Sequence, residues 1–234
     1  MSEEVVQDIA MSGVFGLAYN LKTDTTPQQQ SVSSALLPHL NSSIFTVDLK
    51  YHDDGEYEFG YINNSKYTDE IYYMPLNDGA KYWSLNFTMY TFGGAHLWYA
   101  QDQVAIADTG TSLLLLPNHI VDAYYGAVKG AVLGDYGWVF PCGSKLPHFQ
   151  LAFGHTDDSK FTIPGEYINY AQLPPVAGNG TCLGGIQYKD DAPFSILGDI
   201  FLKAVFAVFD YGNARVGFAA KPAVNNALAA THPA

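Results

Sequence analysis

The segment 104–117 places one acidic residue between two apolar runs. It reads Val-Ala-Ile-Ala-Asp-Thr-Gly-Thr-Ser-Leu-Leu-Leu-Leu-Pro, and Asp108 is its only charged residue. A carboxylate among apolar neighbours is costly to bury unless hydrogen bonds hold it. The small, donor-rich residues after Asp108 can supply those bonds. Any fold of this chain must therefore surround Asp108 with apolar residues and still offer it donors, which indicates a carboxylate kept for chemistry rather than for structure.

The composition favours an all-β protein. Of the 234 residues 48% are hydrophobic, enough for a substantial core in one or two domains. Aromatic residues reach 15% and charged residues only 15%, a mixture that suits β-strands. Few helices are expected, and the two candidates cover residues 27–40 and 117–128. Short apolar alternations between turn residues predict strands over 45–51, 56–62, 70–74, 148–153, 160–163 and 206–210.

The charge balance and the missing motifs exclude several classes of function. The 11 Lys and Arg residues face 23 Asp and Glu residues, a net charge of −12, so nucleic acid and anionic membranes are not expected partners. No run is long enough for a transmembrane helix, and the acidic first residues do not resemble a signal peptide. Metal-ligand spacings and glycine-rich phosphate loops are absent, so we expect no metal and no cofactor.

Two cysteines and four sequons indicate a compartment outside the cytosol. Cys142 and Cys182 fit one disulfide, and two unrelated buried thiols are the alternative. In the chain-entropy model such a disulfide stabilises the fold by about 4 kcal/mol. The candidate N-glycosylation sites, each in an Asn-x-Ser/Thr sequon, are Asn41, Asn63, Asn86 and Asn179.

Several further segments accompany the motif at Asp108, and together they resemble the pepsin-like aspartic proteases, in particular the penicillopepsin- and aspergillopepsin-like branch. The likeness extends along nearly the whole chain and is far more specific than Asp-Thr-Gly alone. The motif itself is similar to the second catalytic segment of that family. The other matching segments are 12–19, 57–62, 140–142, 163–165, 182–186, 194–201, 207–210 and 216–218.

The resemblance implies a pepsin-like β-barrel lobe and hydrolysis of peptide bonds by a water activated between two aspartates. Asp108 would be one of the two. By the same resemblance, Thr109 would hydrogen-bond across to its counterpart, and the Thr111 hydroxyl would donate to Asp108. Gly110 would let backbone and substrate approach closely. The residues that would contact substrate are Ile106, Gly110, Thr111 and Ile196.

The chain contains one Asp-Thr-Gly, whereas the family uses two. The resemblance also implies that an apolar strand ending in glycine threads each Asp-Thr-Gly loop, with Gly198 in the second lobe and Gly16 as its counterpart from the first. If a first aspartate precedes Gly16 by the same interval that separates Asp108 from Gly198, it would lie upstream of Met1. The resemblance therefore implies a second lobe without most of the first. The predicted organisation is a remnant of the N-terminal lobe with the interdomain connection at 1–44, the C-terminal catalytic lobe at 45–222 and a flexible tail at 223–234.

The predicted function is that of an aspartic endopeptidase acting on peptides or proteins. This chain would supply the second catalytic aspartate and would be inactive without the missing N-terminal lobe. One alternative is a homodimeric protease in which two Asp108 side chains face each other. Another is a non-catalytic protein that keeps only the pepsin fold. The parent protein is expected to be secreted or vacuolar.

Overall fold

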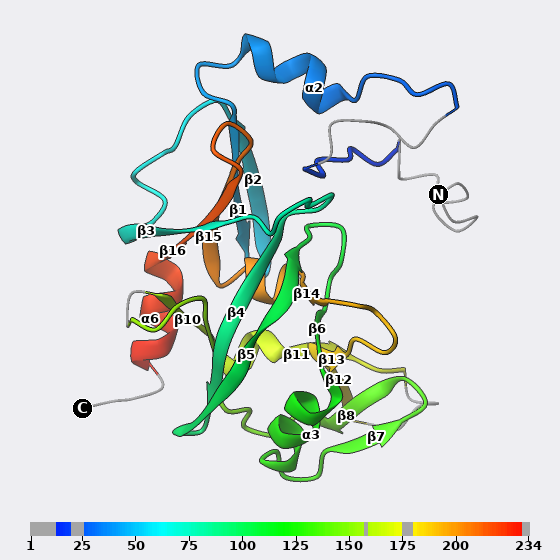
Figure 1. Ribbon diagram of the computed structural model, residues 1–234. Coiled ribbons are helices and arrows are strands. Elements are labelled where there is room, and N and C mark those ends of the chain that lie inside the picture. The colour runs from blue at the N-terminus through cyan, green and yellow to red at the C-terminus, as the bar shows by residue number, and fades with distance from the viewer. Residues whose placement is uncertain (1–12, 20–25, 157–158, 175–179, 231–234) are drawn as a thin grey trace.

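The computed structural model describes residues 13–19, 26–156, 159–174 and 180–230. Within these residues the strands form three sheets, and the few helices are short (Figure 1). The fold is therefore all-β, as the composition and the strand pattern predict. None of the described helices is long and apolar enough to cross a membrane.

The first sheet has five strands in the order β2-β1-β15-β16-β3, all antiparallel. Its strands alternate between two environments, as expected for a period of two residues. On β15, Val205, Ala207 and Phe209 enter the main hydrophobic core, whereas Phe206 and Val208 lie in a second, smaller cluster. The sheet is therefore covered on both faces. Its strands are β1 (Ile44–Lys50), β2 (Asp53–Phe59), β3 (Thr68–Pro75), β15 (Val205–Asp210) and β16 (Arg215–Ala220).

The second sheet has seven strands in the order β10-β9-β4-β5-β14-β6-β13. Most neighbours are antiparallel, but β14 runs parallel to β5, and β13 runs parallel to β6. These parallel pairs bring segments far apart in the sequence together beside Asp108. The strands are β4 (Ser84–Phe92), β5 (Ala95–Ala107), β6 (Leu114–Leu116), β9 (Phe149–Ala152), β10 (Lys160–Ile163), β13 (Ile186–Tyr188) and β14 (Ser195–Leu197).

The third sheet has four strands in the order β11-β12-β8-β7. A disulfide joins Cys142, just after β8, to Cys182 in β12, with 4.9 Å between the two Cα atoms. The predicted pairing of the two cysteines is therefore confirmed. The strands are β7 (Val132–Gly134), β8 (Gly137–Pro141), β11 (Asn169–Gln172) and β12 (Thr181–Gly184).

The helix expected over 27–40 is much shorter in the structure. α2 (Val32–Leu36) begins where the Ser31 side chain accepts a hydrogen bond from a backbone N–H of the first turn. It gives way to the 3-10 turn η1 (Leu37–His39), which contains Pro38. Proline lacks the N–H that a continued α-helix requires, so the regular helix ends here.

The second expected helix is confirmed. α3 (Asn118–Gly126) lies within the predicted range 117–128, and it buries Ile120, Val121 and Tyr124 in the core. The apolar residues whose spacing predicted this helix are therefore the ones that pack against the core. Two single-turn helices were not expected, α4 (Gly165–Ile168) and α5 (Asp199–Leu202).

The tail predicted at 223–234 is described by the structure as far as residue 230, and residues 231–234 lie outside the described residues. Residues Pro222–Ala230 form helix α6. Val224 is only 4% exposed, and Leu228, four residues later on the same helix face, packs against the main core. The Asn225 side chain also donates a hydrogen bond of 3.1 Å to Thr68 Oγ1 in β3. The alanine-rich composition thus supports a docked helix because two apolar residues share one face.

Candidate active site

Asp108 lies in the loop between β5 and β6, and the end of β14 passes through this loop. The Asp108 N–H donates to the Leu197 carbonyl over 3.1 Å. On the far side, the Asp199 N–H donates to the Thr111 carbonyl over 2.8 Å. The apolar strand β14 therefore fixes both ends of the Asp108 loop through backbone hydrogen bonds, as the resemblance implies.

Gly198 is required at the point where β14 passes through the loop. A Cβ atom at this position would lie 2.2 Å from the Thr111 carbonyl oxygen and 2.3 Å from that of Leu113. Both neighbours are backbone atoms, which cannot rotate away. Only glycine allows the two segments to approach this closely.

The Asp108 carboxylate is held by its own loop. Oδ1 accepts a hydrogen bond of 2.9 Å from the Gly110 N–H, and Oδ2 accepts one of 2.7 Å from the Thr111 hydroxyl. The side chain is half-buried, so each oxygen keeps accepting capacity for a water or substrate. The predicted hydrogen bond from Thr111 is therefore present. A Cβ on Gly110 would lie 3.2 Å from Asp108 Oδ1, a close contact that glycine avoids.

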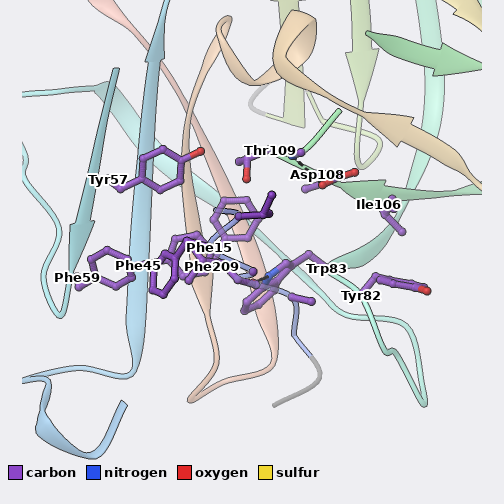
Figure 2. A pocket seen from close by; sticks show the side chains of 16 residues that line it. Phe15, Phe45, Tyr57, Phe59, Tyr82, Trp83, Ile106, Asp108, Thr109 and Phe209 are labelled. Carbon is purple, nitrogen blue, oxygen red and sulfur yellow. Dashed lines mark hydrogen bonds between the residues drawn. The ribbon is translucent and has the colours of Figure 1, made fainter. Parts of the chain in front are cut away.

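A cavity of about 660 Å³ opens beside Asp108. Figure 2 shows Asp108 and Thr109 at its edge and a group of aromatic rings around the remaining wall. These rings come from distant parts of the chain, namely the segment 13–19, β1, β2, the residues just before β4, and β15. The aromatic residues are Phe15, Phe45, Tyr57, Phe59, Tyr82, Trp83 and Phe209.

The other predicted site residues differ in whether they line a cavity. Ile106 is buried and lines both this cavity and a second one of about 450 Å³. Thr109 lines the first cavity and, within the part of the chain that the structure describes, its hydroxyl has no hydrogen-bond partner. Ile196 pairs with Ile106 across β14 and β5, but it lines neither cavity.

Asp199 is a second acid near the loop that sequence reasoning did not single out. Burial raises the pKa of its carboxyl, the nearby Lys203 opposes that rise, and the charge of Asp108 adds to it. Its Oδ1 atom is buried and has no hydrogen-bond partner among the residues that the structure describes. The signal was available, because Asp199 also interrupts an apolar run, 194–201, just as Asp108 does.

The segment 13–19 forms one wall of the cavity and was predicted only as a remnant. Trp83 Nε1 donates to the Leu17 carbonyl over 2.7 Å, and the Tyr211 hydroxyl donates to the same oxygen over 3.1 Å. Val14 and Phe15 remain 65% and 53% exposed. The segment is therefore anchored at Leu17 and presents apolar side chains towards Asp108.

The described residues contain no cluster of His, Cys, Asp or Glu side chains that could hold a metal ion. Of the sequon asparagines, Asn41 is exposed, and Asn63 and Asn86 are half-buried. Asn86 accepts a hydrogen bond of 3.2 Å from Asn77. Asn179 lies outside the described residues.

The sequence matches the family model described as eukaryotic aspartyl protease over residues 1–221. It is 40% identical over 224 residues to aspergillopepsin-1 of Aspergillus flavus, covering 94% of this chain and 54% of that protein. It is 39% identical over 226 residues to podosporapepsin of Podospora anserina, covering 95% of this chain and 52% of that protein. The chain spans about half the length of the curated relatives it matches. With an Asp-Thr-Gly loop threaded by β14 and a match over nearly its full length, the chain belongs to the eukaryotic aspartyl protease family.

Proposed function

We propose that this chain is the Asp108-bearing half of an aspartic endopeptidase, and that a second polypeptide segment supplies the other catalytic carboxyl group. The observation that carries the proposal is the Asp108 carboxylate itself. It is half-buried at the edge of an apolar cavity, and each oxygen accepts only one hydrogen bond from its own loop. Such a carboxylate can still accept a hydrogen bond from a water that would act as the nucleophile.

The chemistry requires one acid to accept a proton and another to donate one. The water held by Asp108 would attack the peptide carbonyl carbon and lose a proton to a carboxylate. The neutral carboxyl group would protonate the carbonyl oxygen, and the leaving nitrogen would take a proton as the C–N bond breaks. Two carboxyl groups at close range titrate at different pH values, as is known for aspartic proteases, so one ionised and one neutral acid coexist.

The second acid does not come from Asp199 in this proposal. Asp199 follows the strand that passes through the loop, and its Oδ1 atom is buried rather than facing the cavity. It is also absent from the residues that line the cavity. The free side of the cavity, where Val14 and Phe15 are exposed, is the place where a segment carrying the other carboxyl group would pack.

Substrate would lie along the cavities on both sides of Ile106. Ile106 and Tyr82 line both the cavity beside Asp108 and the second one, which Phe194 also lines. We also retain Gly110, Thr111 and Ile196 as proposed substrate contacts. The disulfide and the sequons support secretion or vacuolar targeting of the parent protein, with Asn41 and Asn63 as glycosylated residues.

The test is complementation. The purified chain is assayed on casein between pH 3 and 6, alone and after refolding with the remaining half of an aspergillopepsin-1. We expect no turnover by the chain alone, turnover by the mixture, and none when the mixture contains Asp108→Asn. Equal activity with Asp108→Asn would overturn the proposal. Turnover by the chain alone at twice its monomer mass would favour the Asp108–Asp108 homodimer instead.

A further inference from the structure

The loop 60–67 joins the two opposite edges of the five-stranded sheet. It leaves β2 at one edge and enters β3 at the other, so it must cross the strands between them. It crosses on the face that points away from the main core, which we call the outer face. There Ile62 and Tyr67 of the loop pack over Phe206, Val208 and Ala219, each of which is 0% exposed.

The contact between the loop and the outer face is close. The Tyr67 ring stacks on the Phe206 ring with 5.1 Å between the centroids. Ile71 and Tyr73 of β3 complete the apolar cluster. Ile62 and Tyr67 of the loop therefore shield Phe206 and Val208 from water together with these two residues of β3.

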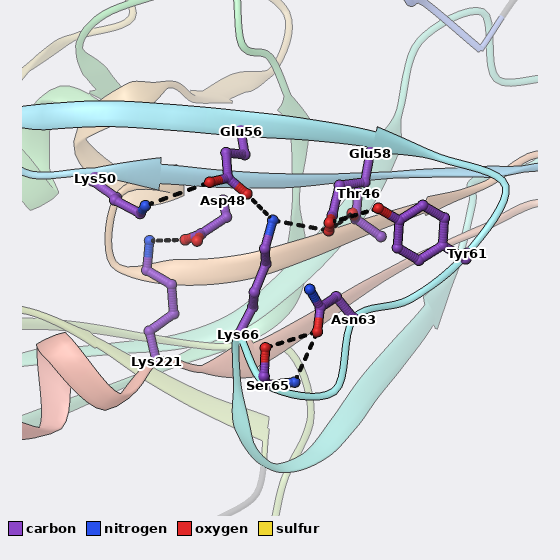
Figure 3. A network of polar contacts seen from close by, with 10 residues as sticks. All are labelled: Thr46, Asp48, Lys50, Glu56, Glu58, Tyr61, Asn63, Ser65, Lys66 and Lys221. Atoms are coloured by element: carbon purple, nitrogen blue, oxygen red, sulfur yellow. Dashed lines mark hydrogen bonds and ion pairs between the residues drawn. The ribbon is translucent and has the colours of Figure 1, made fainter.

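One lysine fastens this loop to the edge strand β2. Lys66 Nζ makes ion pairs with Glu56 and with Glu58, the latter at 3.0 Å (Figure 3). The Lys66 and Glu58 side chains are each only 12% exposed, so solvent screens this pair little. The Tyr61 hydroxyl donates to Glu58 Oε1 over 2.9 Å, which adds a second attachment of the loop. We call Glu56, Glu58, Tyr61 and Lys66 the latch.

Strand alternation ties the latch to the candidate active site. Glu56 and Glu58 point to the outer face, while Tyr57 and Phe59, between and after them, line the cavity beside Asp108. A single edge strand, β2, therefore has the latch on one face and the cavity wall on the other.

We propose that the loop 60–67 is an acid-released lid: protonation of Glu56 and Glu58 frees Lys66, and the loop opens to expose the apolar outer face. In the closed state both glutamates are anions that accept bonds from the loop. In the open state they are neutral, and the lysine ammonium is solvated. No bond other than these hydrogen bonds and ion pairs changes.

The direction of the pH effect follows from the carboxyl groups. Hydrogen bonding and the charge of Lys66 lower the pKa of Glu56. Partial burial raises the pKa of Glu58, but hydrogen bonds from Lys66 and Tyr61 outweigh it, so the net pKa is below the ordinary value. A carboxyl group whose pKa is lowered in the closed state stabilises that state at pH values above the ordinary glutamate pKa of about 4.3. This stabilisation is lost as the pH falls through the lowered pKa of the closed state. The lid therefore opens only in acid.

Other charged groups lie near the latch, and their pH effects must be distinguished from those of the latch. On β1, Lys50 Nζ lies 3.9 Å from Glu56, and Asp48 pairs with Lys221 at 3.0 Å (Figure 3). At the far side of the cluster the Arg215 guanidinium lies over the Tyr73 ring and pairs with Asp210. Hydrogen bonds lower the pKa of Asp210 against the effect of burial, so it also titrates in acid. A variant that removes only the latch charges is the way to isolate it.

The experiment compares hydrogen exchange of the full chain in the wild type and in the Glu56→Gln/Glu58→Gln double variant. At pH 7 the protection factors of the amides in loop 60–67 should fall about tenfold or more. The reason is that a charge-assisted hydrogen bond contributes more free energy than a tenfold change in an equilibrium constant requires. Binding of an apolar dye should rise in parallel. The wild type should show both changes only below about pH 4, near the ordinary glutamate pKa. The loop of the double variant should be insensitive to pH.

Two controls keep the test decisive. Glu70→Gln makes the same chemical change on β3, where the exposed Glu70 makes no ion pair among the described residues. The Glu70→Gln variant should therefore keep the loop protected at pH 7. Lys66→Met, which removes the other half of the latch, should open the loop at pH 7. The amides of Leu85 and Phe87 must stay protected in every variant, which shows that the fold is intact. A loop that stays protected in the double variant, or in acid in the wild type, refutes the proposal.

Discussion

Replacing Gly198 with alanine tests whether the threaded loop holds Asp108 in place. The backbone at Gly198 has φ −83° and ψ −162°, which alanine adopts without strain. The whole cost is therefore steric. The added Cβ would lie 2.2 Å from the Thr111 oxygen and 2.3 Å from the Leu113 oxygen, so β14 and the Asp108 loop must separate.

The magnitude follows from the hydrogen bonds that the separation weakens. The Asp108, Asp199 and Ile200 N–H groups each donate across the junction, at 3.1, 2.8 and 3.1 Å. At about 1 kcal/mol for each bond, their loss costs about 3 kcal/mol. Residual overpacking adds about 1 kcal/mol or more. For a chain of this size a loss of about 4 kcal/mol lowers Tm by roughly 8–16 °C.

Differential scanning calorimetry measures this shift, with Gly143→Ala as the matched control. A Cβ at Gly143 would have no neighbour within 4 Å, so its Tm should change little. Activity in the complementation assay should also fall, because the Asp108 carboxylate moves with its loop. A Gly198→Ala variant with the Tm of the wild type would refute the threading argument.

Three further sets of variants test two acidic side chains of the interior, Asp199 and Asp48, and the disulfide. Asp199→Asn should raise Tm at pH 7 and leave it unchanged at pH 3. Because the pKa of Asp199 is raised in the folded state, the stability of the wild type falls as the pH rises through that raised pKa. Equal shifts of Tm at both pH values would contradict this. Lys221→Met should cost about 3–5 kcal/mol in urea unfolding by leaving Asp48 buried and unpaired, and the double variant with Asp48→Leu should recover most of the loss. Cys142→Ala with Cys182→Ala should cost about 4 kcal/mol, since the disulfide closes a loop over a separation of 40 residues.

The sequence by itself determined the local features of this protein. Among the described residues, the hydrogen bonds that the Asp108 carboxylate accepts come from its own Asp-Thr-Gly-Thr stretch, from residues two and three positions away. Strand alternation and the helix over 117–128 were also readable, because periods of two and of about 3.6 residues are visible in one dimension. The resemblance to the family added what pattern alone does not contain, the expected role of Asp108.

Only the tertiary structure decided what surrounds that motif. The cavity wall combines Phe15, Tyr57 and Phe209, and no pattern relates residues so far apart. The burial of the Asp199 Oδ1 atom, the docking of α6 and the packing of the loop 60–67 over Phe206 likewise depend on which segments meet. Hydrogen bonds within a turn are set by neighbouring residues, whereas burial and pKa shifts depend on contacts that exist only once the sheets have assembled.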